Sequence, residues 1–238
     1  MGTGWEDRPP LLMIGTVHRD PRGKSKLLGL LRRERPDLVS VEISPYARAF
    51  RAQKSAGLRT TLRENLGRIH REEGRPWREI LSHSAIQGIF LLLKEPYEWR
   101  AASAYGVESG CRVQDIDLSE FSEEKLDHVS EVVSLENLRT LLRLSFPSLP
   151  EQVADHYRRA RFLISHPPSG WVHGRQMEKR ESAMSQKIRR LFSQAEGKRM
   201  AHVGGWEHLL ELSGGLTLYS LLKDMGPRRL LLGETGND

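Results

Sequence analysis

The chain has little cysteine and no long apolar run, and both absences narrow its class. Cys111 is the single cysteine in 238 residues, which excludes an internal disulfide and favours a buried structural thiol in a reducing compartment. No stretch reaches the roughly 18 uncharged apolar residues that a membrane span needs. The N-terminus also lacks a basic region followed by an apolar one. We therefore expect a soluble, cytoplasmic protein without a membrane span.

Aromatic residues are scarce, at 7% of the chain, and none form a stacking motif beside the basic residues. The 37 Lys and Arg exceed the 31 Asp and Glu, for a net charge of +6. The basic residues mostly alternate with Glu or apolar residues at helical spacing, as on solvated faces, which argues against a nucleic-acid partner. The G-x-S-x-G motif of a covalent serine hydrolase is also absent, which argues against a catalytic triad.

No Gly/Ser-rich linker or low-complexity run divides the chain. We predict a single α/β domain over residues 1–238, with a mostly parallel or mixed central sheet flanked by helices. Two long helical insertions are expected at about 46–105 and 122–195. Short apolar runs predict strands at residues 11–16, 38–43, 112–117, 199–203 and 229–232.

The pattern G-x-x-H occurs four times, whereas chance predicts about 0.8 copies, so context must decide which copies matter. Only the copies ending in His18 and His208 directly follow an apolar run that predicts a strand opening into a ligand loop. His173 and His202 are kept as further candidates. Histidine is the commonest protein metal ligand and a frequent general base, and α/β proteins place such groups at the ends of parallel strands.

Acidic residues end the next two expected strands. Burying a carboxylate such as Glu42 at the end of a strand that is covered on both faces costs free energy, so this side chain needs a partner. If the first two strands are neighbours in a βαβ unit, Glu42 lies beside His18; a helix cap or an ion pair with arginine is the alternative. Asp115 and Asp117 share one face by the period of two, and for this pair alone capping of the next helix is the favoured interpretation.

A further acidic candidate lies within an expected helix. Met177, Glu181 and Met184 stand at i, i+4 and i+7, which places Glu181 on the apolar face, where a solvated charge is not expected. Arg180 precedes it directly. An intrahelical ion pair between Arg180 and Glu181 is the alternative interpretation.

Three segments together carry a family resemblance. They are LLMIGTVHRDPRGKSKLLGLLRRERPDLVSVEISPYARAF at residues 11–50, KRESAM at 179–184 and HVGGWEHL at 202–209. In this order they resemble the TraB/PrgY family, within the superfamily that includes Tiki proteases, ChaN-like haem-binding proteins and erythromycin esterases. The resemblance implies that His18, Glu42, Arg180, Glu181 and His208 are site residues, with Asp115 or Asp117 as an acidic group after the third strand.

Two histidines and a carboxylate at strand ends could hold a divalent metal such as Zn, Mn or Co, with His18, His208 and Glu42 as ligands. Glu181 or Asp117 would then accept the proton of a metal-bound water, while Arg180 orients carboxylates or stabilises an oxyanion. This predicts metal-dependent hydrolysis of an ester or peptide bond, with a peptide or small-molecule ester as substrate.

Two alternatives remain open. In a metal-free version, His18 acts as general base paired with Glu42, as the esterase branch of the superfamily suggests. In a non-enzymatic version, the resemblance implies binding of haem or of a peptide signal, with the apolar segment 86–93 as lining. The sequence leaves homo-oligomer formation open.

Overall fold

The computed structural model describes residues 10–168, 174–195, 198–212 and 216–234. In this part of the chain, five strands form one parallel sheet in the order β3-β2-β4-β1-β5. The predicted α/β fold is thereby confirmed. The strands are β1 (Leu11–Thr16), β2 (Leu38–Val41), β3 (Arg112–Asp115), β4 (Met200–Gly205) and β5 (Arg228–Leu231).

The order of the strands differs from the expected pairing of the first two. β4 lies between β1 and β2, and its His202 is in register with Met13 on one side and Ser40 on the other. β1 and β2 are parallel but not neighbours, because a strand from the far end of the chain is inserted between them. The carboxyl ends of all three strands still meet at one edge of the sheet, where their following loops lie close together.

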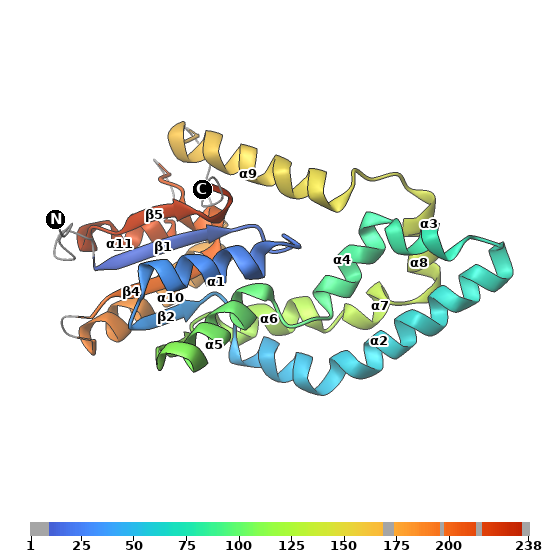
Figure 1. Cartoon of the computed structure of the whole chain (residues 1–238), viewed down its shortest axis with the longest axis horizontal. Coiled ribbons are helices and arrows are strands. Elements are labelled where there is room, and N and C mark those ends of the chain that lie inside the picture. The colour runs from blue at the N-terminus through green and yellow to red at the C-terminus, as the bar shows by residue number, and fades with distance from the viewer. Residues whose placement is uncertain (1–9, 169–173, 196–197, 213–215, 235–238) are drawn as a thin grey trace.

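Helices cover both faces of the sheet. Figure 1 shows α1 (Gly23–Glu34) in front of the strands and α10 (Arg175–Ser193) behind them. Alternate β1 side chains enter two separate cores: Leu12 and Ile14 lie in the cluster that also holds Leu27 of α1, while Leu11 and Met13 lie in the one that holds Met184 of α10. α5 (Tyr97–Ser109) joins α1, and α11 (Leu218–Leu222) joins α10. Helices therefore cover both faces of the sheet, as is usual for a parallel sheet.

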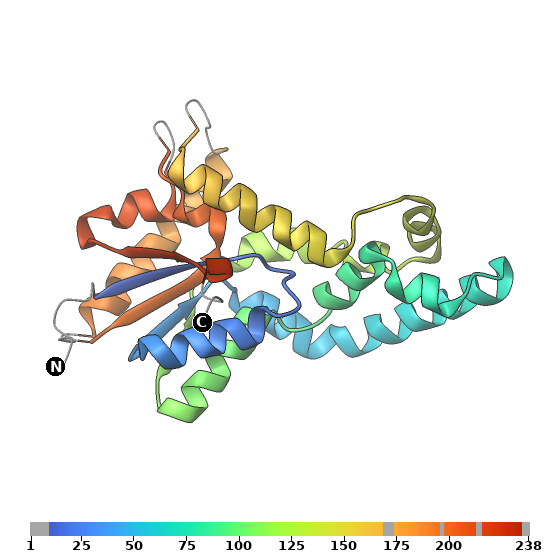
Figure 2. The ribbon, with the colours of Figure 1, turned by 45° about the horizontal axis from the view of Figure 1, so that its top comes forward.

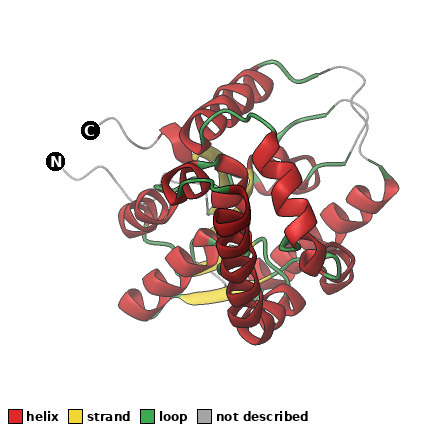
Figure 3. Ribbon diagram, turned by 90° about the vertical axis from the view of Figure 1, so that its right-hand side faces the viewer, coloured by secondary structure: helices red, strands yellow, loops and turns green. Residues whose placement is uncertain are grey.

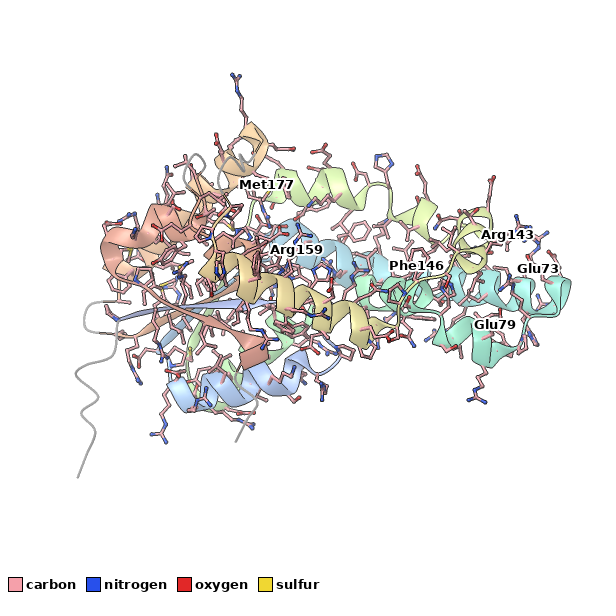
Figure 4. All side chains as sticks on the ribbon, turned by 90° about the horizontal axis from the view of Figure 1, so that it is seen from above. Glu73, Glu79, Arg143, Phe146, Arg159 and Met177 are labelled. Atoms are coloured by element: carbon pink, nitrogen blue, oxygen red, sulfur yellow. The ribbon has the colours of Figure 1, made fainter. Side chains whose placement is uncertain are left out.

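Most of the remaining helices form a lobe beyond the carboxyl ends of the strands (Figures 1 and 2). Seen from the lobe, helices stand in front and most of the sheet lies behind them (Figure 3). In Figure 4, Glu73 and Arg143 lie toward the far end of this lobe, whereas Met177 lies over the half that contains the sheet. The lobe helices are α2 (Pro45–Glu73), α3 (Trp77–Ser82), α4 (Ser84–Leu92), α6 (Ser119–Leu126), α7 (Val129–Val132) and α8 (Leu135–Arg143). α9 (Leu149–Ser165) runs from the lobe back to the sheet, where it contacts β5 (Figure 1).

The expected insertions therefore contain two kinds of helix: α5 and α10 cover the sheet and α9 packs against β5, whereas the others build the lobe. Short 3₁₀ turns complete the chain after β4 and around β5: η2 (Trp206–Leu209), η3 (Lys223–Met225) and η4 (Leu232–Glu234). None of the helices in the described ranges has the length and apolar character needed to cross a bilayer.

Local sequence explains how α2 leaves the sheet so close to Glu42. The Ser44 hydroxyl accepts a hydrogen bond from the backbone N–H of Ala47 at 3.0 Å, which is a normal N-cap contact. Pro45 occupies the first helical position, where its missing N–H costs nothing. The helix therefore begins three residues after Glu42 and carries its first side chains past the strand ends.

Candidate functional site

Glu42 lies at the centre of a polar cluster at the carboxyl ends of β1, β2 and β4. Its backbone N–H donates to Val203 O at 2.8 Å, which extends the pairing with β4 one residue past β2. Its side chain is 6% exposed and both carboxylate oxygens accept hydrogen bonds. Oε2 accepts from the backbone N–H of Gly205 at 2.6 Å, while Oε1 lies 3.0 Å from His208 Nε2 and accepts from Arg180 Nη2.

The doublet Gly204–Gly205 makes room for this cluster. A Cβ at Gly204 would lie 2.9 Å from His202 Nε2 and 3.0 Å from Glu42 Oε2. A Cβ at Gly205 would lie 3.0 Å from His18 Nε2. Two glycines at the end of β4 are therefore required by the close approach of three side chains to the backbone.

His208 joins Glu42 to Glu181. It lies in the 3₁₀ turn η2 directly after β4, and its Nδ1 lies 2.6 Å from Glu181 Oε1. Glu181 is 1% exposed and lies on the buried face of α10 with Met184, as its spacing predicted. Burial lowers the pKa of His208, but the charges and hydrogen bonds of Glu42 and Glu181 outweigh it and raise the pKa to about 10. His208 is therefore a buried imidazolium at neutral pH.

Arg180 joins Glu42 to Asp117. Its Nε and Nη2 donate to the two Asp117 oxygens at 2.7 and 2.8 Å, which is the fork geometry that only arginine provides. The guanidinium carbon lies 4.6 Å from the ring centroid of Phe121. Burial lowers the pKa of Arg180, but the charge of Glu42 and the hydrogen bonds and charge of Asp117 outweigh this effect and raise the pKa above its ordinary value. The guanidinium therefore stays charged. This is an orienting role for Nε and Nη2, which both donate to carboxylates.

The pKa of Glu42 follows from these neighbours. Burial raises it, but the positive charges of His208 and Arg180 lower it by more, with His18 adding to them, so it falls well below its usual range. Glu42 is therefore a fixed negative charge, and a weak base.

His18 is the member of the cluster that faces solvent. Its side chain is 57% exposed, and its Nδ1 lies 2.9 Å from Glu98 Oε1. Its Nε2 lies 3.9 Å from Glu42 Oε2. Burial by the surrounding protein lowers the pKa of His18, but the hydrogen bond and charge of Glu98 and the charge of Glu42 raise it to about 9.

The backbone on either side of His18 is held firmly. Before it, Thr16 ends β1 with its Oγ1 3.0 Å from both Glu98 Oε1 and Gly204 O. After it, the buried Asp20 accepts hydrogen bonds from the Arg22 backbone N–H at 2.9 Å and from Lys26 Nζ at 3.0 Å. The loop between β1 and α1 therefore presents His18 from a fixed position.

Glu98 is the site residue that sequence reasoning missed. It is 3% exposed, lies in the first turn of α5 and meets His18 across 80 residues of sequence. Acidic residues are common in the first turn of a helix, where they favour the helix dipole, so Glu98 carried no distinctive pattern. The available signal was its position between Tyr97 and Trp99, where a solvated charge is out of place.

The other predicted residues are separated by the structure. Asp115 points away from Glu42 and pairs with Arg48 Nη1 at 2.7 Å. β3 ends at Asp115, so the alternation of side chains does not extend to Asp117: Asp115 stays outside the cluster, whereas Asp117 belongs to it through Arg180. His202 is fully buried beneath the cluster, with its Nδ1 3.1 Å from Ser40 Oγ and a pKa that burial lowers to about 3. His173 lies outside the described residues.

The predicted metal ligands are engaged with one another. In the described ranges, no group of three or more His, Cys, Asp or Glu side chains is arranged to hold a metal ion. Both ring nitrogens of His208 face carboxylates, and Arg180 donates to Glu42, so hydrogen bonds occupy two of the three predicted ligands, and, in the described part of the chain, only His18 Nε2 is left without one. A cation at Glu42 would also meet two neighbouring positive charges. As arranged, the three residues fit a charge-assisted hydrogen-bond network and do not fit a coordination set.

Comparison of the chain with protein-family models, with curated proteins and with solved structures finds no match. The TraB/PrgY resemblance stays a prediction from the sequence, and the proposals below depend on the geometry of the site.

Proposed function

We propose that the chain is a hydrolase of ester or peptide bonds in which His18 activates the attacking water. One observation carries the proposal: His18 is held at Nδ1 by the buried Glu98, while more than half of its side chain remains exposed. A carboxylate that orients a histidine whose other nitrogen is accessible is the arrangement of a general base in acyl transfer.

Water is the nucleophile that suits this arrangement. Among the described residues, no Ser, Thr or Cys hydrogen-bonds to His18 Nε2, and Cys111 is buried at the far end of β3. His18 Nε2 takes a proton from water as its oxygen bonds to the carbonyl carbon, and Glu98 stabilises the resulting imidazolium. As the tetrahedral intermediate collapses, the same proton passes from Nε2 to the departing alcohol or amine.

The buried network supports this reaction by fixing charge. Glu42 remains ionised beside Nε2, at 3.9 Å, and favours the imidazolium that forms on proton transfer. Arg180 and His208 hold the Glu42 carboxylate in place from the side opposite to solvent. This is the metal-free version of the hydrolase, since the donors of a metal version already serve this network.

The test is hydrolysis of p-nitrophenyl esters and of fluorogenic peptides by the wild type and by variants. We expect His18→Gln to lower kcat/KM by at least about 100-fold, because general-base catalysis contributes that much. His128→Gln is the matched control, since His128 forms an exposed pair with Glu131 at 3.2 Å and should leave the rate unchanged. Turnover that survives both His18→Gln and Glu98→Gln within about threefold would refute the assignment.

A further inference from the structure

Arg51 is a partly buried cation near the site, and within the described residues it has no carboxylate partner. Its Nη1 donates to the Ala47 carbonyl at 3.0 Å, and its Nε is buried without a hydrogen-bond partner. Burial lowers the pKa of Arg51, which is the mark of a charge taken from water without full compensation. Such a group is costly unless something pairs with it.

The neighbouring arginine shows how a carboxylate partner is supplied on this helix. Arg48 lies one turn earlier on α2, pairs with Asp115 at 2.7 Å and stacks on the ring of Trp99 with its guanidinium carbon 3.9 Å from the centroid. Its Nε is buried without a hydrogen-bond partner, as that of Arg51 is. The two arginines therefore differ in the carboxylate, which Arg48 has and which, within the described residues, Arg51 lacks.

Ser55 supplies a second unpaired donor beside Arg51. It lies four residues further along α2 and therefore on the same face of the helix. Ser55 is 6% exposed, and its Oγ is buried without a hydrogen-bond partner. A serine within a helix normally donates to the carbonyl four residues before it, and Ser55 does not. Two unpaired donors, one of them charged, therefore line the same strip of α2.

Glu98 links this strip to the proposed reaction. The charges of Glu95 and Glu98 act on Arg51, and Glu98 is the residue that binds His18. Arg19, directly after His18, brings a second guanidinium toward the lobe: its Nη1 would lie 3.2 Å from a Cβ at Gly88 of α4. Arg51 therefore lies within reach of the charge of Glu98, and Arg19 adds a second positive charge next to His18 in the chain.

We propose that the substrate carries a carboxylate, which Arg51 binds with Ser55 as a second hydrogen-bond donor. This rests on the proposed hydrolase function and names its substrate class: an ester or peptide with a free carboxylate a few atoms from the bond that is cleaved. A single guanidinium with one hydroxyl matches the single charge and two oxygens of a carboxylate; a phosphate dianion would call for further cationic donors.

The test compares two esters of similar length. One is the mono-p-nitrophenyl ester of glutarate, which ends in a carboxylate, and the other is p-nitrophenyl valerate, which ends in a methyl group. We expect the wild type to prefer the glutarate ester by about tenfold or more in kcat/KM, mainly through KM, because a hydrogen-bonded charge of this kind contributes that much. Arg51→Gln should reduce the preference to about twofold or less, and Ser55→Ala should reduce it partly.

The control for lost charge is Arg63→Gln, because Arg63 is an exposed arginine on the same helix and should leave the preference intact. Thermal unfolding shows whether each variant is folded, and Arg51→Met serves as a second variant of similar length. Equal losses on both esters would overturn the proposal, because Arg51 would then act on Glu98 and not on a substrate carboxylate.

Binding of glutarate, measured by calorimetry, separates this inference from the hydrolase proposal. Glutarate that binds the wild type and not Arg51→Gln supports the carboxylate site, even if no ester is hydrolysed and the proposed function fails. Glutarate that binds neither protein, or both equally, overturns the carboxylate site, even if both esters are cleaved with dependence on His18.

Discussion

Replacing Glu98 by Gln should move the protonation of His18 by more than any other single change near the site. Gln keeps the shape of the side chain and a contact with Thr16, so the substitution removes charge with little change in volume. It also removes the two largest contributions that raise the pKa of His18, the hydrogen bond and the charge of Glu98. Only Glu42 then still raises this pKa, while burial and His208 lower it.

The size of the change follows from these contributions. With Glu98 present, the pKa of His18 is about 9, so about one ring in a hundred is neutral at pH 7. Without the charge of Glu98, we expect this pKa to fall toward its ordinary value. The side chain is 57% exposed, so solvent screens part of the Glu98 charge, and we expect a fall of at least about one pH unit.

NMR titration of the imidazole side chains measures this without a substrate. The chain has nine histidines, and the His18 signal is assigned as the one that disappears in His18→Gln. In an active enzyme, the same shift should appear in the pH dependence of kcat/KM, with the plateau reached at lower pH and at a lower rate in Glu98→Gln. A titration midpoint that moves by less than about 0.3 units, or a wild-type midpoint near the ordinary value, would refute this account of the pair.

Three further predictions concern the buried network. Glu181→Gln should lower the free energy of unfolding at neutral pH by about 3 kcal/mol, because it leaves a buried imidazolium with one partner. The pKa of His208 is raised from 6.5 to about 10, so this stabilisation is complete below pH 6.5 and is lost as the pH rises through 10. Urea unfolding should therefore show that the difference in free energy of unfolding between wild type and Glu181→Gln shrinks between pH 6.5 and 10. A difference that stays constant over this range would contradict the prediction. Gly204→Ala should cost about 1–3 kcal/mol in the same assay, whereas Gly29→Ala, where a Cβ would meet nothing within 4 Å, should cost nothing. Chelation by EDTA should leave hydrolysis unchanged; loss of activity that Zn, Mn or Co restores would instead support the metal-dependent version.

Much of the sheet could be predicted from the sequence, and so could the site residues Glu42 and Glu181, because both depend on local sequence patterns. The apolar run that ends in Gly15-Thr16 predicts a strand at residues 11–16, and β1 has these bounds. Glu42 stood out because a carboxylate after a doubly covered strand needs a partner, and it has three. Glu181 stood out for the same reason on a helix face.

The remainder depends on contacts that no local pattern carries. Glu98 and His18 are 80 residues apart, and the pairing exists only because α5 packs against α1 over the same face of the sheet. The placement of β4 between β1 and β2 likewise depends on a strand near the end of the chain. Strands that follow one another in the sequence are often neighbours in a sheet. That rule fails for β1 and β2, the two strands that lead to His18 and Glu42.

The two histidines whose G-x-x-H copies follow strands, His18 and His208, cannot share a role. His208 is 4% exposed at its side chain, with each ring nitrogen against a carboxylate, so it cannot reach a substrate and serves to hold Glu42. His18 is 57% exposed and has one nitrogen directed toward the space beside Glu42 and Gly205. The same motif, placed at the ends of adjacent strands, therefore gives one fixed charge and one group able to exchange a proton. Loss of hydrolysis in His208→Gln should accordingly be rescued in part by conditions that stabilise the fold, whereas loss in His18→Gln should not.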